Sequence, residues 1–215
     1  MIKINKLLTK YNYTKGRVKP IKYIVLHYTA GNGDTALGNC KYFLGMNRNA
    51  SAHYFVDDKS IWQSVEDYNT AWSVGAKSYK HKECRNHNSI SIEMCSRIKN
   101  GEYYITEDTL RNAIELTKYL AEKYNIPHKN IIRHYDVTGK ECPKPYINDY
   151  KWEREFKNML TFNITQAKVN GKRLNSIMYN NENYIRLRDI GKLINYDVGY
   201  NKYTKEITFK SSEQD

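Results

Sequence analysis

Two stretches of the chain have the hydrophobic pattern of buried β-strands. Residues 22–29 form an almost continuous run of apolar and β-branched side chains, which is typical of a strand covered on both faces. Residues 88–95 instead alternate between large apolar side chains and serine, glutamate or cysteine. Alternation places the two sets on opposite faces of a strand, so Glu93 points either into a site or into solvent. Residues 50–56 and 60–65 are predicted to form a hairpin.

The apolar spacing of other segments predicts helices. Residues 35–44 and 152–160 have helical spacing, and a long helix is predicted to begin after Thr106 and to end before Pro127. Thr106 is a favourable N-cap, and the acidic residues that follow it interact well with the helix dipole. A short strand is expected over residues 131–134. Strands that alternate with helices indicate an α/β domain.

A polar, irregular stretch separates the predicted hairpin from the alternating strand. It runs from Glu66 to Asn88, contains Gly75 and carries charges throughout. Because an irregular segment of this length is uncommon in a compact domain, it is a candidate substrate loop.

The character of the chain changes near residues 161–167. Beyond this point short strand patterns alternate with Asn-rich turns, and one brief amphipathic segment covers residues 187–194. We therefore expect an N-terminal domain over residues 1–162 and a small α+β module over residues 163–215.

Composition and charge narrow the classes of function. The chain of 215 residues has a formal net charge of +12, which favours an anionic partner or serves only to keep a lysine-rich surface soluble. No apolar run reaches the ~18 residues of a membrane span, so no membrane insertion is expected. The basic N-terminus lacks the apolar stretch of a signal peptide, so synthesis in the cytoplasm without general export is expected. The four cysteines are then expected to be reduced.

Three residues far apart in the chain have the types expected of zinc ligands. His27 and His134 each end a predicted strand, and Cys142 stands before a proline. Each alone is more often a structural side chain, but together they offer three nitrogen and sulfur ligands and leave one tetrahedral position for water, as in catalytic zinc sites. A hydrolase of this kind also needs a base and a positive group for the developing oxyanion. Glu93 and Lys140 are the candidates.

Five separated motifs together resemble those of the zinc-dependent N-acetylmuramoyl-L-alanine amidases. In chain order they are the strand that ends at His27, Ser51–Asp57, Thr70–Trp72, Ser91–Met94, and His134 followed by Lys140–Pro143. The resemblance covers roughly the first 160 residues. It implies the fold of the peptidoglycan recognition proteins, a mixed central sheet flanked by helices. It also implies Zn²⁺ ligands at His27, His134 and Cys142, an acid/base group at Glu93 and an oxyanion-stabilising group at Lys140.

The same resemblance implies a reaction and a substrate. Water activated at the zinc would hydrolyse the amide between the lactyl group of N-acetylmuramic acid and the L-alanine of the peptidoglycan stem peptide. Tyr54 would line the cleft, and Trp72 would stack on sugar or peptide. Two positions differ from the family pattern, since Ser73 stands where many members have histidine and Lys144 where glycine is usual.

The tail resembles the small wall-associated repeats that are similar to the N-terminal domain of copper amine oxidases. The resemblance rests on residues 183–190 and 203–209 and implies attachment to the cell wall, with anionic wall polymers as partners. No copper site is expected, since the tail contains neither histidine nor cysteine. With no export signal, this organisation favours a phage or prophage endolysin, released through a separate membrane pore, over a secreted autolysin.

Two other functions stay open from the sequence. A protein of the same fold could bind wall fragments without cutting them, although binding alone requires none of Glu93, Lys140 and Cys142. Nucleic-acid binding is motivated only by the net charge, because the chain has no zinc-finger spacing and no RNA-recognition motif.

Overall fold

The computed structural model describes residues 2–161, 163–169, 171–179, 182–201 and 203–211. The chain divides into two compact units, Met1–Leu160 and Thr161–Asp215, and each is described by itself. The division falls close to the boundary expected at residue 162, which itself lies outside the described residues.

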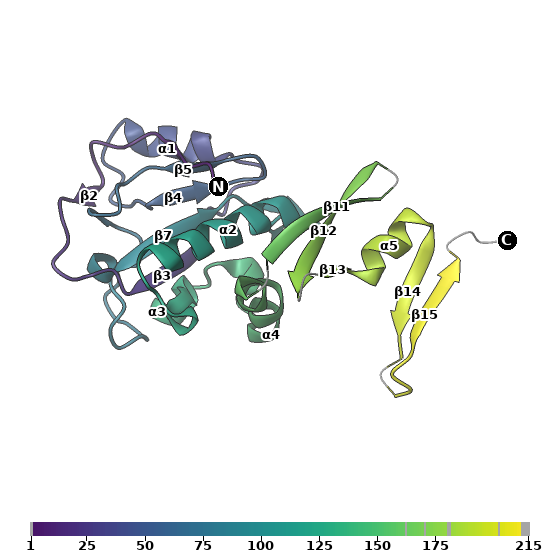
Figure 1. Cartoon of the computed structure of the whole chain (residues 1–215). Coiled ribbons are helices and arrows are strands. Elements are labelled where there is room, and N and C mark those ends of the chain that lie inside the picture. The colour runs from purple at the N-terminus through teal and green to yellow at the C-terminus, as the bar shows by residue number, and fades with distance from the viewer. Residues whose placement is uncertain (1, 162, 170, 180–181, 202, 212–215) are drawn as a thin grey trace. The chain divides into compact units, whose positions relative to one another are not determined.

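A mixed sheet forms the centre of the first unit (Figure 1). Its strands are β1 (Asn5–Lys6), β3 (Tyr23–Tyr28), β4 (Tyr54–Val56), β5 (Ile61–Gln63), β7 (Ser89–Met94) and β10 (Ile131–Arg133). They lie in the order β1-β5-β4-β7-β3-β10, and the four pairs β1–β5, β4–β7, β7–β3 and β3–β10 are parallel. The antiparallel pair β4–β5 is the predicted hairpin. The expected α/β class, with a mixed sheet flanked by helices, is confirmed.

One face of this sheet is apolar and is covered by helix α2 (Glu107–Lys123). Its central side chains are Ile24, Leu26, Ile90, Ile92 and Met94, all fully buried. They occupy alternate positions of β3 and β7, so they share a face. Thr106 caps the helix as expected, because its hydroxyl accepts a 3.2 Å hydrogen bond from the N–H of Thr109. Each such aliphatic side chain contributes about 1.5–3 kcal/mol when buried, so this face supplies much of the stability of the unit.

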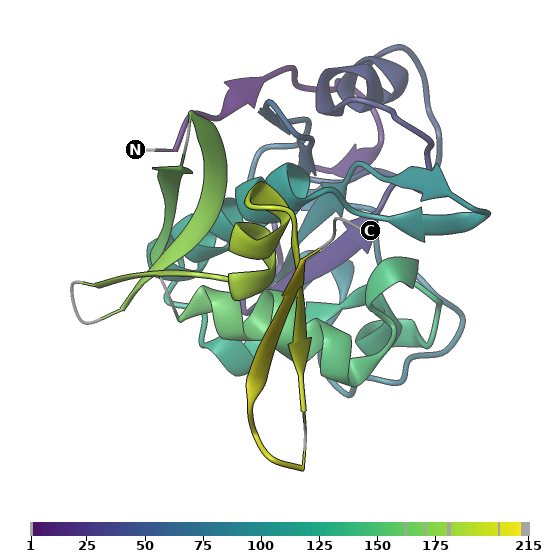
Figure 2. The same ribbon diagram turned by 90° about the vertical axis from the view of Figure 1, so that its right-hand side faces the viewer.

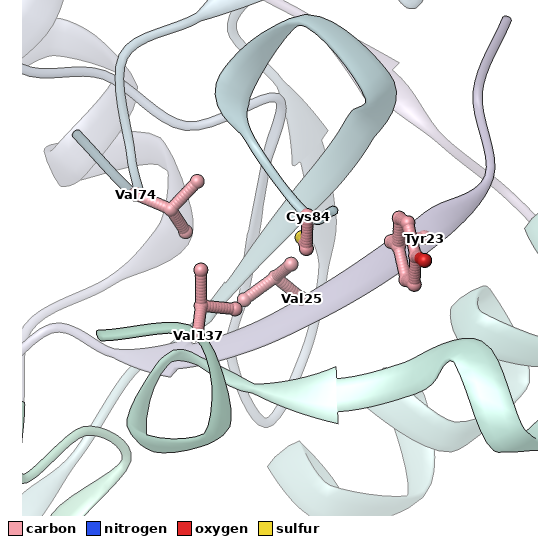
Figure 3. Close-up of a cluster of buried hydrophobic side chains, with 5 residues drawn as sticks. All are labelled: Tyr23, Val25, Val74, Cys84 and Val137. Atoms are coloured by element: carbon pink, nitrogen blue, oxygen red, sulfur yellow. The ribbon is translucent and has the colours of Figure 1, made fainter. Parts of the chain in front are cut away.

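The opposite face of β3 anchors the loop that was predicted to be irregular. Tyr23, Val25, Val74, Cys84 and Val137 point toward one another in a buried cluster (Figure 3). Val137 belongs to helix α3 (His134–Thr138), while Val74 and Cys84 belong to the loop between β6 (Thr70–Ala71) and a 3₁₀ turn at Asn86–Asn88. The cluster therefore fastens this loop and α3 to the strand that carries His27.

Helix α1 (Ala36–Leu44) packs against β4 and β5. The hydroxyl of Thr35 accepts a 3.1 Å hydrogen bond from the N–H of Gly38, which caps the predicted helix. Ala36 and Cys40 of this helix contact Phe55 of β4 in a second buried cluster. At the end of the unit, α4 (Asp149–Trp152) continues through a π-helical turn (Glu153–Lys157) into a 3₁₀ turn (Asn158–Leu160), which confirms the helical spacing expected there.

One local feature agrees with the expectation, and a second differs from it. Helix α2 ends at Lys123, before Pro127, because Asn125 adopts a left-handed conformation (φ 51°) that terminates helices. The pattern of hydrophobic and polar positions did not predict the hairpin of β8 (Arg97–Lys99) and β9 (Glu102–Tyr104). Its turn residues are asparagine and glycine with φ values of 53° and 80°, which is the strongest short-range hairpin signal.

The second unit consists of a small sheet, a helix and a hairpin (Figure 2). Its elements are β11 (Asn163–Val169), β12 (Lys172–Tyr179), β13 (Glu182–Ile185), α5 (Leu187–Leu193), β14 (Tyr196–Tyr200) and β15 (Ile207–Ser211). The pairs β11–β12, β12–β13 and β14–β15 are antiparallel. Helix α5 confirms the predicted amphipathic segment, and it packs on β14 so closely that a Cβ at Gly191 would lie 2.5 Å from Val198. None of the helices in the described part of the chain is long and apolar enough to span a bilayer.

Candidate metal centre and active site

His27, His134 and Cys142 converge beside the ends of two neighbouring parallel strands. His27 lies near the end of β3, and His134 directly follows β10, which pairs with β3. Cys142 lies in the loop after α3, and its carbonyl accepts a 2.8 Å hydrogen bond from the N–H of Tyr135. One nitrogen or sulfur atom from each of the three residues lies within 4.8 Å of the others. The fold therefore brings the three predicted ligands together.

The donor types and their surroundings fit a metal ion. His27, His134 and Cys142 are only 2%, 6% and 3% exposed. Among the described residues, nevertheless, Nε2 of His27 and Nδ1 of His134 have no hydrogen-bond partner. A buried polar atom without a partner costs free energy unless something binds to it. Two imidazoles and one thiol are donors that suit zinc.

Burial keeps both imidazoles in the neutral form that binds metals. It lowers the pKa of His27 well below its ordinary value, and the charges of His134 and Lys140 act in the same direction. Burial, together with Lys140, also lowers the pKa of His134 to about 4. Burial and the neighbouring Glu93 raise the pKa of Cys142 to about 12. The thiol therefore needs a bound cation in order to ionise at neutral pH.

Glu93 lies beside the ligand group. The parallel register of β3 and β7 pairs Glu93 with His27, and Oε1 of Glu93 lies 3.9 Å from Nδ1 of His27. Its other oxygen, Oε2, has no hydrogen-bond partner among the described residues. Burial raises the pKa of Glu93 to about 8, an effect that Lys140 opposes and Asp34 reinforces. Its position beside the ligand group and its unpartnered oxygen are the geometry that a general base requires.

An open cleft of about 610 Å³ lies next to the ligand group. His134 and Lys140 line one part of it, and Trp72 and Lys77 from the anchored loop line another. Lys140 is exposed, and its charge influences the pKa values of His134 and Glu93. Trp72 and Lys140 therefore line the same cleft.

Tyr54 does not lie at the cleft. Its side chain is 2% exposed, and its hydroxyl donates a 2.6 Å hydrogen bond to Asp67. The same carboxylate accepts a hydrogen bond from Tyr124 at the end of α2. The structure therefore does not bring Tyr54 to the cleft, because its position in the alternation of β4 turns the ring toward α2.

A buried arginine next to His134 was not recognised from the sequence. Arg133 is 4% exposed. Its guanidinium donates hydrogen bonds of 2.7–3.0 Å to the carboxylates of Asp136 and Asp149 and to the carbonyls of Tyr146 and Ile147. Only the spacing of three between arginine and Asp136 hints at this pair from sequence, because the other partners depend on the fold.

Known proteins resemble this chain across most of the first unit. A family model described as N-acetylmuramoyl-L-alanine amidase matches residues 17–145. The amidase CwlL of Bacillus licheniformis is 38% identical over 161 residues, which are 69% of this chain and 44% of CwlL. The amidase BlyA of Bacillus subtilis (strain 168) is 31% identical over 179 residues, or 77% of this chain and 46% of BlyA. The chain thus spans less than half the length of these relatives.

Solved structures show the same relationship. PlyL aligns with a TM-score of 0.62 and 27% identity, over 74% of this chain and 97% of PlyL. The catalytic domain of XlyA aligns with a TM-score of 0.61 and 26% identity, over 74% of this chain and 99% of that domain. The region matched by the family model contains His27, Glu93, His134, Lys140 and Cys142. The chain therefore belongs to the N-acetylmuramoyl-L-alanine amidase family.

Proposed function

We propose that this chain is a zinc-dependent amidase that cuts peptidoglycan between the lactyl group of N-acetylmuramic acid and L-alanine. The observation that carries the proposal is the convergence of His27, His134 and Cys142 within 4.8 Å beside an open cleft. Membership of the amidase family supports the choice of bond.

These three residues would hold the zinc ion. When bound there, zinc supplies a Lewis acid that polarises the amide carbonyl and makes water a better nucleophile. The positive charge of a bound ion would also favour the ionised forms of Cys142 and Glu93.

Glu93 would move the proton in this reaction. Its unpartnered Oε2 accepts a proton from the attacking water as the new carbon–oxygen bond forms. The same oxygen then gives the proton to the alanine nitrogen as the carbon–nitrogen bond breaks. The products are the muramic acid carboxylate and a peptide with a free alanine amine. The ammonium group of Lys140, at the edge of the cleft, would stabilise the negative charge that develops on the carbonyl oxygen.

The test is the chemistry of the products. Purified peptidoglycan is incubated with the protein, and new N-terminal alanine and new reducing sugar ends are both quantified. We expect alanine amines to appear, to disappear with a zinc chelator, and to return when zinc is added. Reducing ends without alanine amines would contradict the proposed bond, and activity that survives chelation would contradict the proposed metal.

We also propose that the enzyme acts as an endolysin and that the second unit attaches it to the wall. The net charge of +12 supports attraction to anionic wall polymers. The mixed strand and helix content of Thr161–Asp215 is compatible with the wall-associated module that the tail resembles.

A further inference from the structure

The hairpin of β14 and β15 in the second unit has no further strand paired to it. Among the described residues it forms a two-stranded sheet of its own (Figure 1). An isolated two-stranded hairpin is only marginally stable in water, and further strands or a covering helix are needed for a stable sheet. Helix α5 supplies part of that cover, because it packs on β14 around Val198. The β15 side of the hairpin is therefore the part that a partner would complete.

Strand β15 exposes apolar side chains on the face that α5 covers at β14. Phe209 is paired in register with Val198, and Ile207 is paired with Tyr200, so all four side chains share this face. Phe209 is 46% exposed, and Ile207 is 51% exposed. Large apolar side chains that stay exposed at the edge of a sheet mark a surface that pairs with another chain.

The backbone of the same two residues is directed toward the open edge. The N–H of Asn201 donates a 2.8 Å hydrogen bond to the carbonyl of Glu206. In an antiparallel pair, every second residue turns its N–H and C=O groups to the neighbouring strand. Thr208 therefore faces β14 as Glu206 does, while the N–H and C=O groups of Ile207 and Phe209 point away from β14. Within the described part of the chain, no strand pairs with that edge.

The sequence of β15 is complementary to itself in one antiparallel register. In this register, two copies are aligned so that Thr208 of one faces Thr208 of the other. Glu206 of each copy then lies opposite Lys210 of the other, and Ile207 lies opposite Phe209. Opposite charges, an aromatic ring beside a β-branched side chain, and paired threonines are combinations that stabilise antiparallel strands. Ile207 and Phe209, whose backbones point outward, would form the hydrogen-bonded pairs of this register.

Other alignments match less well. Alignment on Phe209 places Lys210 opposite Thr208, so the lysine has no acidic partner in the other copy. Pairing of β14 with its own copy about the middle of the strand places Asp197 opposite Gly199, which offers neither a charge nor a side chain. A lysine at an edge usually discourages pairing with other strands, but the register aligned on Thr208 gives Lys210 a carboxylate.

We propose that the second unit pairs with a second copy of this chain through β15, antiparallel and aligned on Thr208. The two hairpins then form one four-stranded sheet, with Ile207 and Phe209 of both copies side by side on the face that carries α5. Because the contact uses the same surface on both copies, it closes as a dimer and does not extend into a filament. This pairing involves the second unit alone and does not depend on the proposed function.

The experiment measures the mass of the full chain, loaded with zinc, by analytical ultracentrifugation over a range of concentrations. Glu206→Lys and Lys210→Glu each place like charges opposite each other across the contact, and the double variant restores opposite charges. An equimolar mixture of the two single variants also restores them, because one chain is then positive at both positions and the other is negative. Lys172→Glu, at an exposed position of β12, is the control for the change in charge.

We expect the wild type to sediment as a dimer and each single variant to raise the dissociation constant of the dimer by about 10-fold. The double variant, the mixture and Lys172→Glu should have the wild-type value, and far-UV circular dichroism checks that every variant is folded. A wild type that stays a single chain at about 100 μM would overturn the proposal, as would association that requires added peptidoglycan. A dimer that neither single variant weakens would place the contact on another surface and overturn it as well.

A cross-link tests the register without any change of charge. Thr208→Cys brings two thiols together across the two-fold axis, so mild oxidation should give a disulfide-linked dimer. Thr204→Cys is the control, because this exposed position lies before β15 and away from the axis. The four native cysteines are buried. Equal cross-linking of both variants, or of neither, would contradict the alignment on Thr208.

Discussion

Glu93 differs from other acidic residues of the first unit in what surrounds its carboxylate. It is paired in register with His27, has one oxygen without a partner among the described residues, and has a pKa raised by burial to about 8. Asp57 and Asp67, in contrast, accept several hydrogen bonds each. The unpartnered oxygen of Glu93 is the feature on which its proposed role in proton transfer rests.

We predict that Glu93→Gln keeps the fold and the zinc but lowers turnover by about 10²- to 10⁴-fold, the usual contribution of a general base. Glutamine is similar in shape but cannot take up the proton. The rate of alanine release and the zinc content are measured on the same sample. A rate close to that of the wild type would assign the base to another residue.

A second prediction at the residue scale concerns the metal. Cys142→Ala removes one of three ligands, so it should lose zinc as well as activity. Elemental analysis of the purified protein gives the zinc content per chain. Cys84→Ala is the matched control, because Cys84 is also a buried thiol but belongs to the apolar cluster around Val25 (Figure 3). Full zinc occupancy in Cys142→Ala would mean that the third ligand is misassigned.

At the scale of elements, Arg133 connects helix α3, which begins at His134, to the segment that follows Cys142. Its hydrogen bonds join the first turn of α3 to the carbonyls at 146 and 147 and to Asp149 of α4. The single ammonium group of a lysine cannot donate to all of these acceptors, as the planar guanidinium of arginine does. We therefore predict that Arg133→Lys keeps the fold but weakens zinc binding by about 10- to 100-fold, the usual effect of losing a supporting contact around a metal site.

Competition with a chelator of known affinity measures this change. Arg97→Lys is the control, since Arg97 pairs with Asp58 at a partly exposed site away from the ligand group. Unchanged zinc affinity in Arg133→Lys would show that the three ligands hold their positions without the arginine.

Asp67 joins α2 to the β4–β5 hairpin. Its carboxylate accepts hydrogen bonds from Tyr54, Gln63, Lys123 and Tyr124. Burial alone would raise the pKa of Asp67, but the hydrogen bonds from Tyr124, Tyr54 and Lys123 outweigh it, and the pKa is lowered. The ionised carboxylate therefore stabilises the folded state.

We predict that Asp67→Asn lowers the free energy of unfolding by about 1–3 kcal/mol at neutral pH. Because the folded-state pKa is below the ordinary value of about 3.9, this stabilisation is fully present above that pH and is lost as the pH falls through the lowered pKa. Urea unfolding at several pH values measures the difference from the wild type, with the exposed Glu102→Gln as control. A difference that persists unchanged in strong acid would rule out the ionised carboxylate as its source.

At the scale of the whole molecule, we propose that the first unit cuts peptidoglycan and that the second unit binds the cell wall. The candidate site lies entirely in Met1–Leu160. We predict that residues 1–160 alone hydrolyse a soluble muropeptide at the rate of the full chain but bind intact cell walls less, since the second unit is missing. Cosedimentation with walls and the rate on the muropeptide are compared for both proteins. Equal sedimentation would remove the proposed wall-binding role from the second unit.

Much of the architecture follows from local patterns. The strands around His27 and Glu93, the caps at Thr35 and Thr106, and the helix at 187–194 were all predictable, because alternation, capping and amphipathic spacing act between residues close in sequence. The hairpin at Asn100 also carries a local signal, the Asn-Gly turn with positive φ at both residues.

The identities of the candidate ligands and of the base were also available from the sequence, as residue types in recurring motifs. Their geometry was not, because His27, His134 and Cys142 meet only through the parallel pairing of β3 with β10, a contact between distant segments. The same holds for Tyr54: alternation defines two faces of a strand, but packing against α2 decides which face is core. The hydrogen bonds of Arg133 to residues 146, 147 and 149 likewise join segments that no local pattern relates.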